Sequence, residues 1–229
     1  MNRNGAARQP RASQDIAAQI LNAFYAEGLK PGEWLGTEAE LAERFNVSRV
    51  TIRDAVGGLA ARGLIEVRVG ARGGLRIASS DLDRLIDAFS IQLQLMGLSR
   101  EELFEAMLAI EPVTAGLAAS RASDASIASL QQLVERSREC LDDAVQFTSL
   151  AVGFHQAIAE VSGNRALRAS LAALRATQVQ HLGPPTTRRI AERVARTHGG
   201  IVDAIASRDA DLASERMRTH VRDVLKAPL

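Results

Sequence analysis

The chain has 229 residues, 46% hydrophobic and 24% charged, and its 28 lysine and arginine residues nearly balance 27 acidic ones, giving a formal net charge of +1. This length is enough for two domains with separate cores. We find no apolar run long enough to span a bilayer, no signal-peptide pattern, and a single cysteine, Cys140, which excludes an internal disulfide; we therefore expect a cytoplasmic protein without membrane association.

The N-terminal residues differ in composition from the rest of the chain. Residues 1–12 carry three arginines, no acidic residue and little apolar content, so we interpret them as a disordered basic arm. Two domains are expected after this arm, over residues 13–79 and 80–229, with the linker near Ser79 and Ser80 as the hinge between them.

A helix-turn-helix is predicted between Thr37 and Gly63. Thr37 is a favourable N-cap with Glu40 three residues later, which is the pattern of a capping box. Asn46 tolerates the left-handed backbone of a tight turn, and Ser48 is a favourable N-cap for a second helix. The apolar stripe of this second helix consists of Ile52, Ala55, Val56 and Leu59.

A two-stranded wing is predicted after this second helix. Gly63 ends the helix, residues 64–69 alternate as a strand does, residues 70–74 form a glycine-rich turn, and residues 75–77 return as a second strand. Its positive charge would come from Arg68, Arg72 and Arg76.

The start of the second helix carries the side chains expected to contact DNA. Arg49 and Arg53 lie off the buried stripe, where a guanidinium can donate twice to guanine, whereas Ser48 and Thr51 suit phosphate oxygens. Residues 1–80 have a net charge of +3 and the remainder −2. The positive charge therefore lies in the part of the chain that is expected to contact DNA phosphates. One alternative is a protein-interaction module, which would require Arg49 and Arg53 to be occupied by salt bridges.

A dense series of motifs spans this domain: Pro31-Gly32-Glu33, Glu40-Leu41-Ala42, Val47-Ser48-Arg49, Thr51-Ile52-Arg53, Gly63-Leu64-Ile65 and Gly73-Gly74. They resemble the winged helix of GntR-type bacterial transcription regulators. The resemblance implies a homodimer on double-stranded operator DNA with a short inverted repeat. Ala39 departs from it, because many members carry an arginine there. The DNA-contacting residues are then Thr37, Ser48, Arg49, Thr51, Arg53, Arg68, Gly70, Arg72 and Gly73.

From Asp81 onward the pattern changes to a period of 3.6 residues, rich in alanine, leucine, arginine and glutamate. This predicts an all-helical bundle of six or seven helices. Ser99 and Glu102 form a capping box at the start of one helix, and residues 209–225 form the last. The fold class is therefore mainly α, with an α+β winged helix followed by an all-α domain.

A looser set of motifs continues through this domain: Glu111 with Ala115 to Arg121, Phe154 to Ala159, Ser162-Gly163-Asn164, His198 with Ile201, and Met217-Arg218 with His220. They are similar to the FCD-type effector domain of the FadR branch of the same family. The resemblance implies that this domain binds a small molecule and supplies much of the dimer contact. In many members it holds a divalent metal on one aspartate and three histidines, beside an arginine that pairs with an acidic ligand.

The histidines match this pattern, but two charged positions do not. His155, His198 and His220 fall on the metal-binding positions, whereas Ala151 stands where the aspartate is expected and Met107 where the arginine is expected. We expect the effector pocket among Met107, Glu111, Ala151 and Asn164. Without its arginine, such a pocket favours a more apolar effector over a small carboxylate.

The residues alone leave two interpretations of the histidines. Three of the four lie on apolar faces of separate helices, which suits a zinc, nickel or cobalt site with an open position. The alternative is three core histidines satisfied by backbone or water. His181, just before Gly183, is interpreted as a helix C-terminal cap.

The expected function is a sequence-specific transcription regulator, a repressor, whose operator affinity is modulated by an effector in the helical domain. A three-histidine metalloenzyme is the alternative, because such a site can activate water. However, the chain has no HExxH motif, nucleophile elbow or phosphate loop, and Glu160 lies on a different helix face from His155. We therefore expect no enzyme activity.

Overall fold

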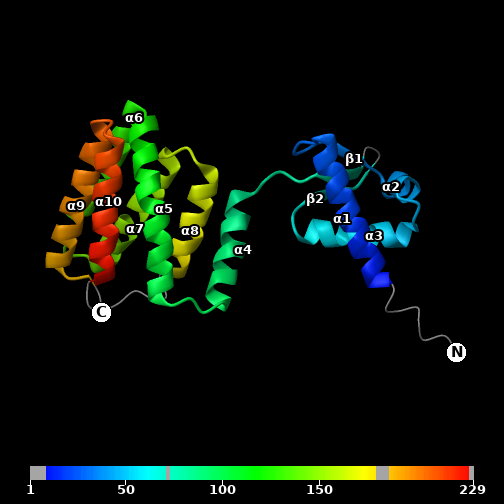
Figure 1. Ribbon diagram of the computed structural model, residues 1–229, viewed down its shortest axis with the longest axis horizontal. Coiled ribbons are helices and arrows are strands. Elements are labelled where there is room, and N and C mark those ends of the chain that lie inside the picture. Colours follow the sequence, from blue (N-terminus) through cyan, green and yellow to red (C-terminus); the bar gives the residue numbers. More distant parts are fainter. Residues whose placement is uncertain (1–8, 71–72, 179–185, 227–229) are drawn as a thin grey trace. The chain divides into compact units, whose positions relative to one another are not determined.

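The computed structural model describes residues 9–70, 73–178 and 186–226, which form two compact units, Met1–Asp81 and Leu82–Leu229 (Figure 1). The division falls two residues after the boundary expected from the sequence. Helix α1 begins at Gln9, so residues 9–12 are helical and the predicted disordered arm was drawn four residues too long.

The first unit is a winged helix. Its core joins the apolar faces of the helices to the sheet through Ile16, Ile20, Leu41, Ile52, Leu59 and Leu75. Strand β1, which pairs with the wing, was not predicted, because three residues are too short to show an alternating pattern. The elements are α1 (Gln9–Glu27), β1 (Trp34–Gly36), α2 (Glu38–Arg44), α3 (Arg49–Ala61), β2 (Ile65–Arg68) and β3 (Gly74–Ile77), with antiparallel sheet order β1-β3-β2.

The predicted helix caps are present. Thr37 Oγ1 accepts from the Glu40 amide at 3.2 Å, and the Glu40 carboxylate accepts from the Thr37 amide at 2.6 Å. Ser48 Oγ accepts from the Thr51 amide at 3.1 Å. Asn46 has a φ of 52°, which provides the tight turn between α2 and α3. These contacts satisfy backbone N–H groups at the starts of α2 and α3.

The second unit is an all-α bundle of seven helices within the described residues, as predicted. Helix α5 is its centre and packs against α7, α8, α9 and α10, while α4 packs along α8 (Figure 1). The core includes Leu103, Ile158, Leu171, Ile201 and Ile205. The helices are α4 (Leu82–Leu95), α5 (Arg100–Arg121), α6 (Asp124–Glu139), α7 (Ala144–Val161), α8 (Arg165–Gln178), α9 (Arg188–Ala206) and α10 (Ala210–Lys226).

Helix α5 corrects one expectation from the sequence. Its 22 residues are long and apolar enough to cross a bilayer by length and composition, although no such run was recognised. Over half of its apolar window is buried inside the bundle, and Glu111 and Pro112 lie within it. Burial by neighbouring helices accounts for its apolar composition.

Candidate functional site

The exposed side of α3 presents the predicted DNA contacts. Arg49 and Arg53 are exposed, while Ile52, Ala55, Val56 and Leu59 of the same helix are buried. Arg53 donates to Glu38 Oε2 from Nε and Nη2, both at 3.3 Å, with 70% of its side chain exposed. An exposed pair of this kind contributes about 0–1 kcal/mol. The contact is therefore weak enough for Arg53 to exchange Glu38 for another acceptor.

The shape of the wing depends on Gly70, Gly73 and Arg76. Gly70 has a φ of +123°, and a Cβ on Gly73 would lie 2.5 Å from the Arg68 carbonyl oxygen. Arg68 is 61% exposed and contacts Glu66 at 3.4 Å. Arg76, expected to give the wing positive charge, instead donates to the Gly32 carbonyl at 3.0 Å and lies over the ring of Trp34. The predicted contact Arg72 lies outside the described residues.

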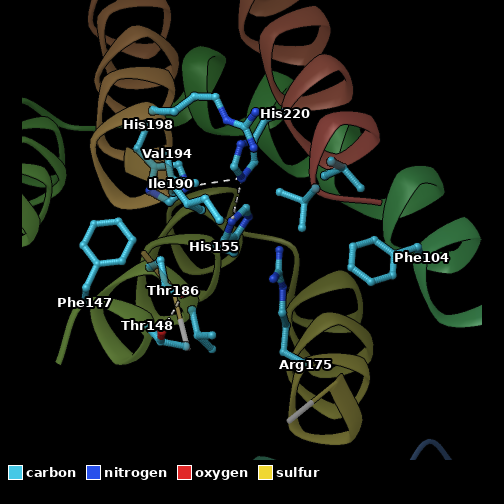
Figure 2. A pocket seen from close by; sticks show the side chains of 15 residues that line it. Phe104, Phe147, Thr148, His155, Arg175, Thr186, Ile190, Val194, His198 and His220 are labelled. Carbon is cyan, nitrogen blue, oxygen red and sulfur yellow. Dashed lines mark hydrogen bonds between the residues drawn. The ribbon is translucent and has the colours of Figure 1, made fainter. Parts of the chain in front are cut away.

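Three histidines from different helices converge in the second unit. His155 on α7, His198 on α9 and His220 on α10 are all buried (Figure 2). The Nε2 atoms of His198 and His220 are 3.2 Å apart, and those of His220 and His155 are 3.3 Å apart. The sequence-based expectation that these three side chains meet is confirmed.

Two of the three nitrogen separations in this cluster agree with a tetrahedral metal site. Nitrogen ligands at about 2.0–2.1 Å from zinc are separated by about 3.3–3.4 Å at tetrahedral angles. The two measured Nε2 separations agree with that spacing, and one candidate ligand atom from each histidine lies within 4.8 Å of the others. The residues present therefore fit a divalent metal.

The electrostatics of the cluster favour neutral imidazoles. Burial lowers the pKa of His155 and of His198 well below the usual value. The charge of Arg175 lowers the pKa of both rings further, and the other two histidines add to the effect at His198. Burial, followed by the charge of His155, lowers the pKa of His220 to about 3. Metal binding needs deprotonated imidazole, so these rings are ready as ligands at neutral pH.

A buried carboxylate lies behind the cluster. Glu111, on α5, is fully buried and places Oε2 against Nδ1 of His155, while Oε1 accepts from Arg175 Nη2 at 2.5 Å. Burial raises the pKa of Glu111, and the charge of Arg175 opposes that rise. Sequence reasoning missed Arg175. The available signal was its position one turn after Leu171 on α8, on the face that is buried.

A cavity of about 160 Å³ opens beside the histidines. Figure 2 shows Arg175 reaching from α8 toward the three rings, with Phe104 and Phe147 on opposite sides. Arg193 and the hydroxyls of Thr148 and Thr186 add polar groups. The wall is otherwise mainly apolar and includes Ala151, Val152, Ile190, Val194, Val221 and Val224.

The effector-pocket prediction needs correction. Of its four residues, only Ala151 lines this cavity. Met107 and Glu111 are fully buried in the core, and Asn164 Oδ1 instead accepts from the amides of Ala166 and Leu167 at the start of α8. The arginine that Met107 replaces was expected to be missing from the pocket, but this cavity receives Arg175 from α8 and Arg193 from α9.

Two residues discussed from the sequence lie away from the cluster. Glu160 pairs with Arg168 Nε at 2.6 Å, which agrees with its expected orientation away from His155. His181, interpreted as a helix cap, lies outside the described residues.

A winged helix joined to a helical bundle with a cavity defines a two-domain, DNA-binding regulator. Residues 12–73 match the bacterial regulatory proteins of the gntR family, and residues 102–223 match the FCD domain. The chain belongs to the GntR family, with an FCD effector domain, and is a transcription regulator rather than an enzyme.

Relatives with known names agree with this assignment. The HTH-type transcriptional repressor NanR of Citrobacter rodentium is 29% identical, over 97% of this chain and 87% of its own length. NanR of Salmonella newport is 31% identical, over 84% of this chain and 76% of its own. The solved structure of Streptococcus agalactiae GntR is 27% identical with a TM-score of 0.57, covering 94% of this chain and all of that one.

Proposed function

We propose that this protein is a homodimeric repressor that acts in the cytoplasm and binds a short inverted repeat through two winged helices. A small molecule in the cavity beside the histidines lowers its affinity for that operator. The observation that carries this proposal is the convergence of three imidazoles at the edge of a cavity that also receives Arg175. Repression is the activity named for the NanR relatives.

A divalent metal is part of this proposal. His155, His198 and His220 would hold zinc or nickel through nitrogen, which suits both ions. A metal held there would provide Lewis acidity for binding an oxygen of the effector. Ala151 has no ligand atom in its side chain and lines the cavity, so water or the effector would complete the coordination.

The lining favours an effector with one acidic end and an apolar body. Arg175 and Arg193 provide positive charge for a carboxylate or similar anion, while Phe104, Phe147 and Val221 offer apolar surface. This combination adds an acidic end to the more apolar effector that the sequence favoured.

The mechanism is thermodynamic linkage between two sites. If the effector binds more tightly to the arrangement of the dimer that fits DNA poorly, effector binding weakens DNA binding. By reciprocity, DNA then weakens effector binding to the same degree. The linker at Ser79 and Ser80 is the proposed hinge.

The test is fluorescence anisotropy with DNA from upstream of the protein's own gene, with and without zinc and a panel of short carboxylic acids. We expect specific binding that one acid weakens, and loss of that response in Arg175→Met with operator binding retained. Arg168→Met, on the same helix, is the matched control. Operator binding that no acid in the panel changes would contradict an acid-sensing role.

A further inference from the structure

Glu111 is a charged group in the middle of the central helix of the bundle. It is fully buried, between the equally buried Met107 on one side and Pro112 and Ala115 on the other. Burying a carboxylate is costly unless it is paired and hydrogen-bonded. An apolar residue would serve packing alone, so the contacts of the Glu111 carboxylate point to a role beyond packing.

The two oxygens of Glu111 have different partners. Oε1 accepts from Arg175 Nη2 at 2.5 Å, and Oε2 lies against Nδ1 of His155. In the described part of the chain, neither Oε2 nor Nδ1 makes a hydrogen bond, and both atoms are buried; the contact between them is close enough for an ion pair. Glu111 Oε2 and His155 Nδ1 are therefore placed to be polar partners of each other.

This contact determines which nitrogen of His155 faces the cluster. A neutral imidazole carries one N–H, and an acceptor beside Nδ1 favours the tautomer with the proton there. The lone pair of Nε2 then points toward His220, whose own Nε2 lies 3.3 Å away. Such a carboxylate partner fixes ring orientation and increases the basicity of a metal-binding histidine.

We propose that Glu111 is a positioning residue of the metal site: it holds His155 as the Nδ1–H tautomer, with Nε2 directed at the metal. Arg175 keeps the carboxylate in place from the opposite side. The inference rests on the proposed metal site and assigns to Glu111 a function distinct from the effector contact expected from the sequence. Glu111 contacts no metal itself and acts through His155.

The first test measures metal affinity in the full-length chain. Zinc and cobalt are titrated in competition with a chromophoric chelator, for the wild-type protein, Glu111→Gln and the matched control Glu160→Gln. Glu160 lies on the same helix as His155 but pairs with Arg168 on a different face. Loss of a carboxylate partner typically weakens metal binding 10–100-fold, so we expect a decrease of about that size in Glu111→Gln and no change in the control.

The outcomes separate this inference from the proposed function. A wild-type protein that binds no metal would refute the metal site and, with it, the role of Glu111. A wild-type protein that binds metal, with equal affinity in Glu111→Gln, would refute only the positioning role. Cobalt absorption adds a second readout, because a reoriented His155 changes the ligand-field bands as well as the affinity.

A second test does not require the Glu111→Gln variant. Long-range proton–nitrogen NMR correlations of the wild-type protein, without metal, report which ring nitrogen of each histidine carries the proton. His155 is assigned by comparison with His198→Gln and His220→Gln. We expect protonated Nδ1 and unprotonated Nε2 in His155, and the opposite tautomer would overturn the proposal.

Discussion

Acidification should destabilise the metal-free helical domain through its histidines. The pKa of His220 falls to about 3 in the folded protein, from 6.5 when exposed, because of burial and then the charge of His155. Below pH 6.5 the unfolded chain takes up a proton at this ring while the folded protein does not. The free energy of unfolding therefore decreases as pH falls, and the loss continues until the pH approaches 3.

The size of this effect can be estimated for one histidine. One proton taken up only by the unfolded chain changes stability by about 1.4 kcal/mol per pH unit well below its pKa. Between pH 7 and pH 5, His220 should account for about 2 kcal/mol of lost stability by this linkage. Glu111, whose pKa is raised mainly by burial, contributes with the opposite sign, but it is present in the wild-type protein and in a His220 variant alike.

The assay is urea unfolding at pH 7 and pH 5 in the presence of a chelator, followed by circular dichroism. His220→Gln removes the titrating group, so its stability should fall by about 2 kcal/mol less than that of the wild-type protein over this interval. If both proteins lose the same stability, His220 is not held neutral by the fold, and the reasoning about ligand-ready imidazoles fails.

Three further predictions concern the two units separately. Arg49→Ala should cost about 1–3 kcal/mol on operator DNA and less on random DNA in anisotropy titrations; equal losses would identify a phosphate contact instead. Gly74→Ala should destabilise the wing by about 1–3 kcal/mol in chemical unfolding, because the added Cβ would lie 2.0 Å from the ring of Trp34 and the backbone φ is +151°. Gly70→Ala is the control, because Gly70 also has a positive φ, +123°, but an added Cβ there meets nothing within 4 Å; equal losses in the two variants would contradict the steric argument. Ala151→Asp, one turn before His155, should raise metal affinity in chelator competition, and an unchanged affinity would show that this position does not face the bound metal.

Local chemistry made the winged helix predictable. The capping box at Thr37, the N-cap at Ser48 and the positive φ at Asn46 each depend on side chains within a few residues, and all are present. The buried stripe of α3 follows from helical periodicity in the same way. Residues 9–12 were misassigned because basic and polar residues also occur at the start of a helix.

The effector cavity was harder to predict because it depends on contacts between distant elements. The three histidines were found through their positions on separate apolar faces, but Arg175 reaches Glu111 across 64 residues of sequence. The one local signal for this arginine is its position one turn after Leu171 on α8, and that position does not identify Glu111 as its partner. Asn164 was assigned to the pocket although its short side chain bonds to nearby amides, which is the usual preference of asparagine before a helix.

The most direct test of the metal-dependent regulator is metal content measured by mass spectrometry on untagged protein, beside His155→Ala. We predict stoichiometric metal in the wild-type protein and its loss in the variant, since removing one of three converging Nε2 atoms leaves too few ligands. Absence of metal from a wild-type protein prepared with zinc and nickel available would contradict the account. The three histidines would then be core residues that bond to one another.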